Sequence, residues 1–392
     1  MRLNHGRHLA YSANVHRGET WPETFQSLNN CALALRESVH PGRPFGIGLR
    51  LSRQAAGQLS ERRTLAGFRR WLEKNDCYVF TINGFPYGRF HGASVKENVY
   101  RPDWTASDRL AYTCLLFDLL AALLPAGVEG SVSTLAGSFK EFDPDAAARK
   151  RIFDNLWRCA RHAARAGGRF GRALRLGLEP EPLCLMENAD ETVRFFDELR
   201  AHCKNDPRVE ECIGVNYDTC HFAIAFEEPR AALSRLVDAG IKISKIQLSS
   251  ALKARPTIAA RQKLKEFADE IYLHQVAVRD ETGRRAVHRD LPDALAGAAA
   301  GAGSSEWRIH FHVPLHAPAV APLETTADDL LRTLDWLAGN PRICSHLEME
   351  TYTWDVLPPE LKARTVVSQL LAEYRWTLHH LAKRGLGALE SD

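Results

Sequence analysis

One short stretch of the sequence, Asp218-Thr-Cys-His221, places a carboxylate and an imidazole three residues apart directly after an apolar run. The run is short enough to be a buried strand, so both side chains would lie where that strand ends. Such a pair suits a divalent cation such as Zn²⁺ or Mn²⁺, and a carboxylate can also orient a histidine base. Alternatively, Asp218 caps the following helix and His221 lies in its first turn.

Two pairs of glutamates follow other strand-like runs. Glu179 and Glu181 end one run, and Glu348 and Glu350 end another. Residues two apart on a strand share a face, so each pair can point the same way. If these strand ends meet, four or five acidic groups would repel one another unless they are protonated or neutralised by a cation. The sequence therefore predicts a divalent-metal site that holds Zn, Mn or Mg.

The elements that must position these groups alternate between strand-like and helix-like patterns. This alternation indicates βα units and a parallel sheet, and seven or eight units favour an α/β fold of the closed (β/α)₈ TIM-barrel type. No G-x-G-x-x-G motif follows the first run, which weighs against a dinucleotide-binding fold. The expected strands are 9–16, 45–51, 78–85, 130–135, 174–182, 212–218, 243–250 and 346–354. The expected helices are 21–39, 59–75, 107–124, 145–166, 190–204 and 360–383.

The alternation breaks after residue 250. Residues 271–278 and 307–314 both look like strands, and between them lie a turn at 280–283 and a run rich in Ala and Gly at 294–305. We therefore expect a strand-rich insertion at about 252–320, over the mouth of the barrel. The chain, residues 1–392, is expected to form a single domain.

Composition limits the function classes. The 392 residues carry a net charge of only +3, which gives no reason to expect nucleic acid or an anionic membrane as a partner. Nine scattered cysteines without a C-x-x-C motif are typical of free thiols in a reducing cytoplasm. The N-terminus lacks an apolar signal segment, and the longest apolar stretch, 115–124, is too short to span a bilayer. We expect a cytoplasmic protein that binds a small molecule, and the sequence allows a homo-oligomer.

At the strand ends the sequence resembles the xylose isomerase-like barrels, which include sugar isomerases, ketose 3-epimerases and endonuclease IV. Asp218-Thr-Cys-His221 looks like the endonuclease IV motif, and Glu350-Thr351 resembles the end of the family's final strand. His310-Phe-His312 is similar to the H-F-H stretch of the ketose 3-epimerases, whose second histidine is a metal ligand. The glutamate that ends the family's fifth strand can be Glu179 or Glu181.

Over its whole length the chain resembles the EboE family, barrel proteins of a bacterial gene cluster named for metabolite traffic. The resemblance lies in residues 83–88, 96–104, 310–315 and 350–358. It implies a role in metabolite traffic and leaves the reaction open.

The sequence departs from the endonuclease IV pattern at three strand ends. Where that enzyme places histidine ligands after strands three and four, this chain has Asn83 and Leu135. In strand seven, Gln247-Leu-Ser-Ser replaces a stretch with further ligands. A trinuclear zinc site would be incomplete, so DNA cleavage is not expected.

The identity of strand seven affects the ligand set. If residues 243–250 form strand seven, Gln247 occupies the ligand position and His312 must reach in from the insertion. If residues 307–314 form strand seven, His312 occupies that position directly. His312 is expected to be a ligand in both topologies.

These residues predict a metal-dependent isomerase or epimerase of a small polyhydroxylated or carbonyl substrate, with the metal stabilising an enediolate as a Lewis acid. The alternative is a non-catalytic metabolite-binding or carrier protein that uses the same pocket. The expected metal ligands are Glu181, Asp218, His312 and Glu348, and the expected catalytic residues are Glu179, Glu350 and His221. The expected substrate-binding residues are Asn83, His91, Gln247 and His310.

Overall fold

Eight parallel strands close into a barrel in the computed structural model, which describes residues 1–92, 94–297, 305–318, 320–362 and 365–387. The barrel closes where the last strand pairs with the first, in the register Glu348 to Ala10. The predicted (β/α)₈ TIM barrel is therefore confirmed. The barrel strands in spatial order are β2 (Arg7–Ser12), β3 (Phe45–Arg50), β4 (Cys77–Asn83), β5 (Gly130–Leu135), β6 (Leu174–Glu179), β7 (Ile213–Asp218), β8 (Ile243–Leu248) and β14 (His346–Met349). A short strand, β1 (Arg2–Leu3), pairs antiparallel with β2.

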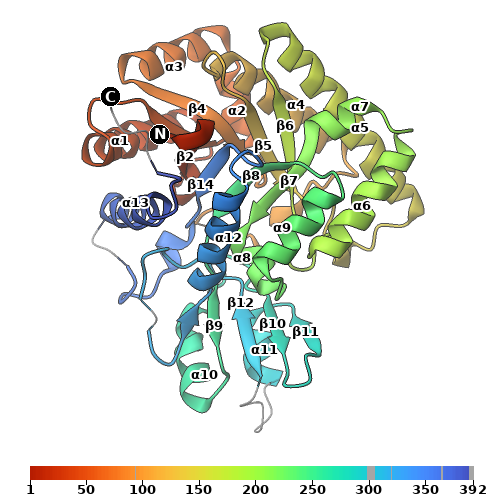
Figure 1. Ribbon diagram of the computed structural model, residues 1–392, viewed down its shortest axis with the longest axis vertical. Helices are drawn as coiled ribbons and strands as arrows, with labels where there is room; N and C mark the ends of the chain where they lie inside the picture. Colours follow the sequence, from red (N-terminus) through yellow and green to blue (C-terminus); the bar gives the residue numbers. More distant parts are fainter. Residues whose placement is uncertain (93, 298–304, 319, 363–364, 388–392) are drawn as a thin grey trace.

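Helices surround the barrel on its outer side (Figure 1). The first and last of them, α1 and α13, lie side by side, which brings the two ends of the chain together around the closing strands. The helices are α1 (Trp21–Val39), α2 (Arg53–Leu59), α3 (Arg62–Lys74), α4 (Ser107–Leu123), α5 (Ala146–Phe170), α6 (Ala189–His202), α7 (Pro207–Cys212), α8 (Thr219–Ile224), α9 (Pro229–Asp238), α12 (Ala327–Gly339) and α13 (Val366–Ala382).

Burial explains why these segments form barrel strands. Seven of the eight barrel strands are buried at every position, and β6 has one half-buried residue, Arg175. Strands of a parallel barrel are covered on both faces, so they appear in the sequence as nearly continuous apolar runs. Local capping fixes the helix starts, as at α1, where Thr20 and Glu23 form a capping box. The expected bounds 21–39 and 130–135 are confirmed, whereas the last helix begins at Val366 and not at residue 360.

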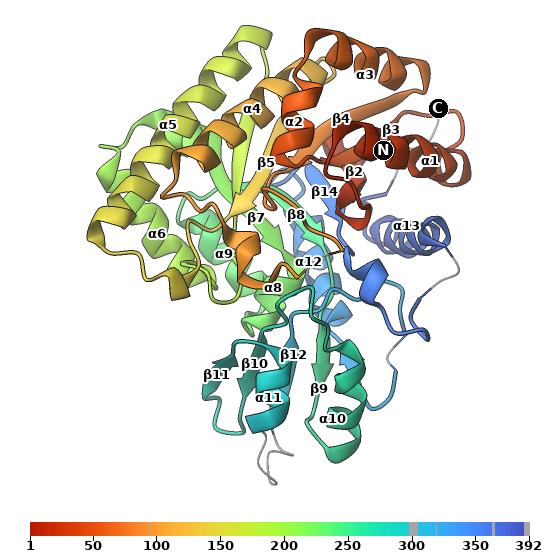
Figure 2. The ribbon, with the colours of Figure 1, turned by 180° about the vertical axis from the view of Figure 1, so that it is seen from behind.

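The insertion forms a second sheet of five strands after β8. The sheet order is β11-β10-β12-β9-β13, and every pairing is antiparallel. Its elements are β9 (Leu252–Ala254), α10 (Ile258–Leu264), β10 (Val276–Arg279), β11 (Arg285–His288), α11 (Leu291–Gly297), β12 (Glu306–Ile309) and β13 (Glu324–Thr325). They lie together below the barrel in both views (Figures 1 and 2) and enclose a small apolar cluster of their own.

This topology identifies strand seven. β8 pairs with both β7 and β14, so residues 243–248 belong to the barrel. The topology in which 307–314 is strand seven is therefore wrong. The expected strand at 307–314 is also shorter, because β12 ends at Ile309, and His310 and His312 follow it in irregular backbone.

Backbone hydrogen bonds fasten the insertion to the barrel mouth. The amides of Val95 and Lys96, in the long loop after β4, donate to the carbonyl of Ile271 over 2.8 and 3.1 Å. The amide of Val313 donates to Ser250, which follows β8. Loops of the barrel and loops of the insertion therefore share one end of the molecule.

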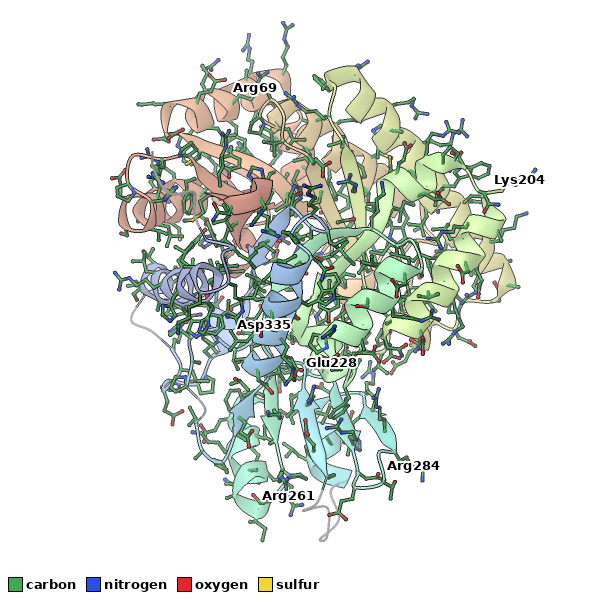
Figure 3. The ribbon with its side chains drawn as sticks, viewed as in Figure 1. Arg69, Lys204, Glu228, Arg261, Arg284 and Asp335 are labelled. Atoms are coloured by element: carbon green, nitrogen blue, oxygen red, sulfur yellow. The ribbon has the colours of Figure 1, made fainter. Side chains whose placement is uncertain are left out.

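Charged side chains of both signs cover the outside of the molecule. Arg69 on α3, Lys204 in the turn after α6, Glu228 at the N-cap of α9 and Arg284 on the insertion are all exposed (Figure 3). Among the residues that the structure describes, no helix is long and apolar enough to cross a membrane.

Candidate metal centre

A pocket with a cavity volume of about 60 Å³ lies at the carboxyl ends of the barrel strands, where active sites of this fold are built. The barrel strands supply its floor, and the loop after β4 and the insertion supply its walls. Seven of the residues expected from the sequence line it: Asn83, Glu179, Glu181, His221, His310, His312 and Glu350.

Three carboxylates meet at the floor. Glu179 ends β6, Asp218 ends β7 and Glu350 follows β14 by one residue, and one oxygen of each lies within 4.8 Å of the others. All three are buried. Burial is the main cause that raises the pKa of both Glu179 and Glu350 well above the usual range, and the neighbouring carboxylates raise it further. Full ionisation of this group requires a nearby cation.

Asp218 fulfils the capping role and still has a free oxygen. Its Oδ1 accepts hydrogen bonds from the amides of Cys220 (2.8 Å) and His221 (3.2 Å) and from the Ser249 hydroxyl (2.5 Å). The predicted cap of α8 is therefore confirmed. Its Oδ2 is buried and has no hydrogen-bond partner among the residues that the structure describes. Capping and metal binding use different oxygens, so they are compatible.

Three histidines present the same nitrogen to the site. The Nδ1 atoms of His221 and His312 lie 3.0 Å from the carbonyls of Pro180 and Glu350, and that of His310 lies 2.7 Å from Gln275 Oε1. These oxygens only accept, so each Nδ1 carries the proton. Burial lowers the pKa of all three rings, to about 4 for His221, so they are neutral.

Each Nε2 is therefore a lone-pair donor. Nε2 of His312 is buried and has no hydrogen-bond partner in the described part of the chain. Nε2 of His221 lies 3.1 Å from Nε2 of His310. Two lone pairs at that distance require a shared proton or a cation between them. Histidines that ligate metals usually have the other nitrogen bonded to a carbonyl or carboxylate, as here.

Unpartnered atoms test whether a cation fits. Asp218 Oδ2, Glu350 Oε2, Glu181 Oε2 and His312 Nε2 are all buried without a hydrogen bond. Each buried polar atom without a partner lowers the stability of the fold by about 1–3 kcal/mol, and a charged atom lowers it by more. Zn²⁺ binds imidazole nitrogen and carboxylate oxygen, whereas Mg²⁺ and Mn²⁺ favour carboxylate oxygen. The residues fit a divalent ion.

Glu181 has a different environment from Glu179. Its Oε1 accepts a hydrogen bond from the Tyr100 hydroxyl at 2.9 Å, and it lies 3.7 Å from Nδ1 of His310. With His221 and His310 it forms a candidate ligand group separate from the one that contains Glu179. Burial raises the pKa of Glu181 to about 8, so this carboxyl group can hold a proton at neutral pH.

Glu348 lies one layer deeper in the barrel than Glu350. It forms an ion pair of 2.5 Å with Lys245, and both side chains are fully buried. Among the described residues, no candidate ligand group includes it. Residues two apart on β14 do share a face, as expected, but they lie at different depths, and only Glu350 reaches the floor of the pocket.

The other expected residues support the site from outside the pocket. Gln247 is buried beneath it, and its Oε1 accepts a hydrogen bond from Asn216, whose amide also donates to Glu179 over 2.7 Å. His91 donates from Nε2 to the Asn14 carbonyl and accepts from the Tyr272 hydroxyl at 2.6 Å. Neither Gln247 nor His91 lines the pocket.

Several residues of the site are absent from the sequence-based prediction. Asn14, just beyond β2, donates to Glu350 over 2.6 Å, and Tyr100 and Gln275 form a chain that joins Glu181 to His310. Asn216 was detectable, because a polar residue interrupts the apolar run of β7 two positions before Asp218. Tyr100 ends a short 3-10 helix (Lys96–Tyr100) within the long loop after β4, and Gln275 lies in irregular backbone just before β10, so neither position follows from the pattern of strands and helices.

Comparisons with known proteins agree with this fold. A family model described as the xylose isomerase-like TIM barrel matches residues 49–287. A xylose isomerase-like TIM barrel protein from Mycobacterium smegmatis, in complex with magnesium, has a TM-score of 0.54 at 13% identity, covering 96% of this chain and 97% of its own. At this identity the likeness concerns the fold.

Two further solved structures have lower scores. An L-ribulose 3-epimerase has a TM-score of 0.49 at 13% identity, covering 96% of this chain and 95% of its own. The IolI protein with a bound zinc atom has a TM-score of 0.49 at 11% identity, covering 96% of this chain and 98% of its own. No curated protein sequence matches the chain significantly.

Proposed function

Because the chain belongs to the xylose isomerase-like TIM barrel family, we propose that it is a divalent-metal-dependent isomerase or epimerase of a small carbonyl-containing metabolite. One observation carries the proposal. Asp218 Oδ2, His312 Nε2 and Glu350 Oε2 are buried without a hydrogen-bond partner among the described residues. Asp218 shares one candidate ligand group with His312 and another with Glu350, and both of these residues line the pocket. A cation is the group that satisfies all three together.

The proposed ligands are Glu179, Asp218, His312 and Glu350. This set differs from the one expected from the sequence, because Glu179 and Glu350 replace Glu181 and Glu348 as ligands, and Glu348 is instead paired with Lys245. Asn216 and Asn14 hold the two glutamates by hydrogen bonds of 2.7 and 2.6 Å. A bound ion would act as a Lewis acid that polarises a substrate carbonyl. The Mycobacterium smegmatis protein of the same fold binds magnesium, and the metal of this chain stays open among Mg, Mn and Zn.

Proton transfer is assigned to the second group of side chains. Glu181 lines the pocket with an unpartnered Oε2 and a pKa of about 8, so it can give or take a proton near neutral pH. His221 and His310, with their Nε2 atoms 3.1 Å apart, can share a proton that reaches or leaves a substrate oxygen. The Tyr100 hydroxyl orients Glu181.

The finer assignment rests on sequence resemblance. We propose membership of the EboE family and a role in metabolite traffic from the stretches 83–88, 96–104, 310–315 and 350–358. We also propose a cytoplasmic location. The endonuclease IV-like motif at Asp218 supports a metal ligand at that position and carries no nuclease activity here, because further ligands of that pattern are absent from the sequence.

Hydrogen exchange in D₂O tests the reaction class. Transfer of a proton at the carbon next to a carbonyl replaces that C–H with C–D, and ¹H NMR detects the loss of signal. A panel of ketoses and α-hydroxyketones with the Mn²⁺- or Zn²⁺-loaded protein should reveal exchange that stops on adding a chelator. Glu181→Gln should abolish exchange while retaining bound metal.

Two contrary results have different meanings. If the protein lacks stoichiometric metal by elemental analysis and binds none when it is added, the proposed function is wrong. If metal binds and the panel includes a ligand that binds without exchange, the protein is a binding or carrier protein.

A further inference from the structure

The pocket has two chemically different halves. The floor holds the carboxylates and the histidines, several with unpartnered atoms. The opposite half is lined by side chains of the loop after β4, the insertion and the segment after β14. These apolar and aromatic residues are Phe85, Phe90, Val95, Val99, Leu273 and Tyr352.

Three rings hold this half together. Phe90, Tyr272 and Tyr352 form a triangle with ring centroids 5.2 to 5.4 Å apart, and Val95 packs against them. These four residues are called the apolar wall. Each comes from one of three segments far apart in the sequence, and all are at most 9% exposed. The wall extends to the floor, because the Tyr352 ring lies 4.8 Å from that of the ligand candidate His312.

Three polar side chains that border this half, those of Tyr272, Tyr100 and Lys96, are already hydrogen-bonded. The Tyr272 hydroxyl donates to His91, which in turn donates to the Asn14 carbonyl. The Tyr100 hydroxyl donates to Glu181. Lys96 lines the pocket, and its ammonium group is bonded to Asp290 (2.7 Å) and to the Asp269 carbonyl (3.0 Å). None of these groups has an unpartnered buried atom.

The difference between the polar floor and the apolar wall favours an amphipathic ligand over a ligand that is polar along its whole length. A ketose has a hydroxyl on almost every carbon, and each hydroxyl that leaves water without a partner costs free energy. The floor can satisfy two or three oxygens, whereas the apolar wall offers an extended substrate few hydrogen bonds. An apolar group placed against the wall instead gains free energy from leaving water and from contact with the rings.

We propose that the substrate is amphipathic: its polar head carries two adjacent oxygens for the floor, and its other part is an apolar or aromatic group that packs against the apolar wall. This deepens and rests on the proposed function, because the head is the part that a metal and Glu181 would act on. It narrows the substrate class from free sugars to carbonyl compounds with a hydrophobic substituent. The insertion is the specificity element, since it supplies Tyr272 and Leu273.

Two chelators that differ only in their apolar part test the proposal. Acetohydroxamate and benzohydroxamate present the same pair of oxygens, with a methyl or a phenyl group attached. Calorimetric titration of the Mn²⁺-loaded protein should give a Kd at least about tenfold lower for benzohydroxamate. D-fructose should compete more weakly than benzohydroxamate.

Two wall variants locate the effect. Phe90→Ala removes a ring, and Val95→Thr keeps the side-chain shape while adding a hydroxyl. Both should reduce the benzohydroxamate preference severalfold and leave acetohydroxamate affinity unchanged. Val287→Thr, an exposed position on β11, is the matched control and should change neither. Circular dichroism of each variant checks folding. If Phe90→Ala does not fold, the affinities of Val95→Thr for the two hydroxamates test the proposal.

The outcomes separate the two proposals. If the protein binds metal but has the same affinity for both hydroxamates, the proposed amphipathic substrate is wrong and the metal site is still supported. The same holds if D-fructose binds more tightly than benzohydroxamate. If no metal binds, saturation-transfer NMR of 3-phenylpropanol with the metal-free protein decides. Transfer to the phenyl protons that is lost in the wall variants supports the apolar subsite, and absence of transfer in the wild type overturns it.

Discussion

Lys245 on β8 and Glu348 on the neighbouring strand β14 form a buried ion pair inside the barrel, with 2.5 Å between Nζ and Oε2. Lys245 also donates to the Ser133 hydroxyl, and the pair lies beneath the candidate metal centre. The positive charge of Lys245 lowers the pKa of Glu179 and Glu350, opposing the burial that raises it. Glu348 acts in the opposite direction and raises the pKa of Glu350, so it is Lys245 that offsets part of the acidic charge of the floor before any cation is bound.

Breaking this pair should destabilise the protein strongly. Lys245→Met keeps the length of the side chain but leaves Glu348 buried without its cation, a loss of about 3–5 kcal/mol in the free energy of unfolding. The double variant Lys245→Met with Glu348→Leu should recover most of that loss, because an apolar pair replaces both charges. Urea unfolding followed by circular dichroism measures both. Equal stability of the single variant and wild type would contradict the buried pair.

Glycine at position 48 is required by the same carboxylate. A Cβ there would lie 1.9 Å from Glu348 Oε1 and 2.8 Å from the Tyr11 carbonyl. Gly48→Ala should therefore lower the melting temperature markedly or prevent folding. Gly67→Ala is the matched control in α3, where a Cβ meets nothing within 4 Å. There the substitution should stabilise the helix by roughly 0.5–1 kcal/mol.

Asp218→Asn separates capping from metal binding. Asparagine caps a helix about as well as aspartate, so in the presence of chelator the melting temperatures of variant and wild type should be similar. Added Mn²⁺ or Zn²⁺ should raise only that of the wild type, by the equivalent of about 2.7 kcal/mol at a hundredfold excess over Kd.

The control for this test is Asp145→Asn, the same substitution at the exposed N-cap of α5. It should leave metal-dependent stabilisation intact. Equal stabilisation of the Asp218→Asn protein by metal would return Asp218 to a purely capping role.

Glu373 on α13 should make stability depend on pH. Burial raises its pKa from 4.5 to about 7, although Thr351 and the Leu315 amide donate hydrogen bonds to it. A pKa raised by folding contributes stability that is complete below about pH 4.5 and is lost as pH rises through about 7. The wild type should therefore lose up to about 3 kcal/mol relative to Glu373→Gln between pH 4.5 and pH 8.

Unfolding curves at several pH values measure this difference. Glutamine keeps an oxygen for both hydrogen bonds, so the two proteins should converge at low pH. Glu61→Gln, at an exposed position, should run parallel to the wild type throughout. A pH-independent gap between Glu373→Gln and wild type would show that Glu373 does not titrate in this range.

The sequence by itself determined the barrel and the position of its acidic residues along the strands. Apolar runs separated by amphipathic segments specify parallel strands covered on both faces, and a polar residue that ends such a run must lie at the carboxyl end of a strand. For this reason Glu179, Asp218 and Glu350 could be named in advance. The cap of α8 followed from the type of residue at position 218 alone.

Only the tertiary structure decided the depth and the partners of these residues. Period-two alternation fixes the face of Glu348 and Glu350, but the layer that each occupies depends on the register with β8, where Lys245 receives Glu348. Likewise, His310 and His312 reach the pocket because the insertion folds back over the barrel mouth and Ile271 accepts hydrogen bonds from the loop after β4. Such contacts join segments more than a hundred residues apart. They are stabilised by packing and burial in the folded protein, which a local sequence pattern does not predict.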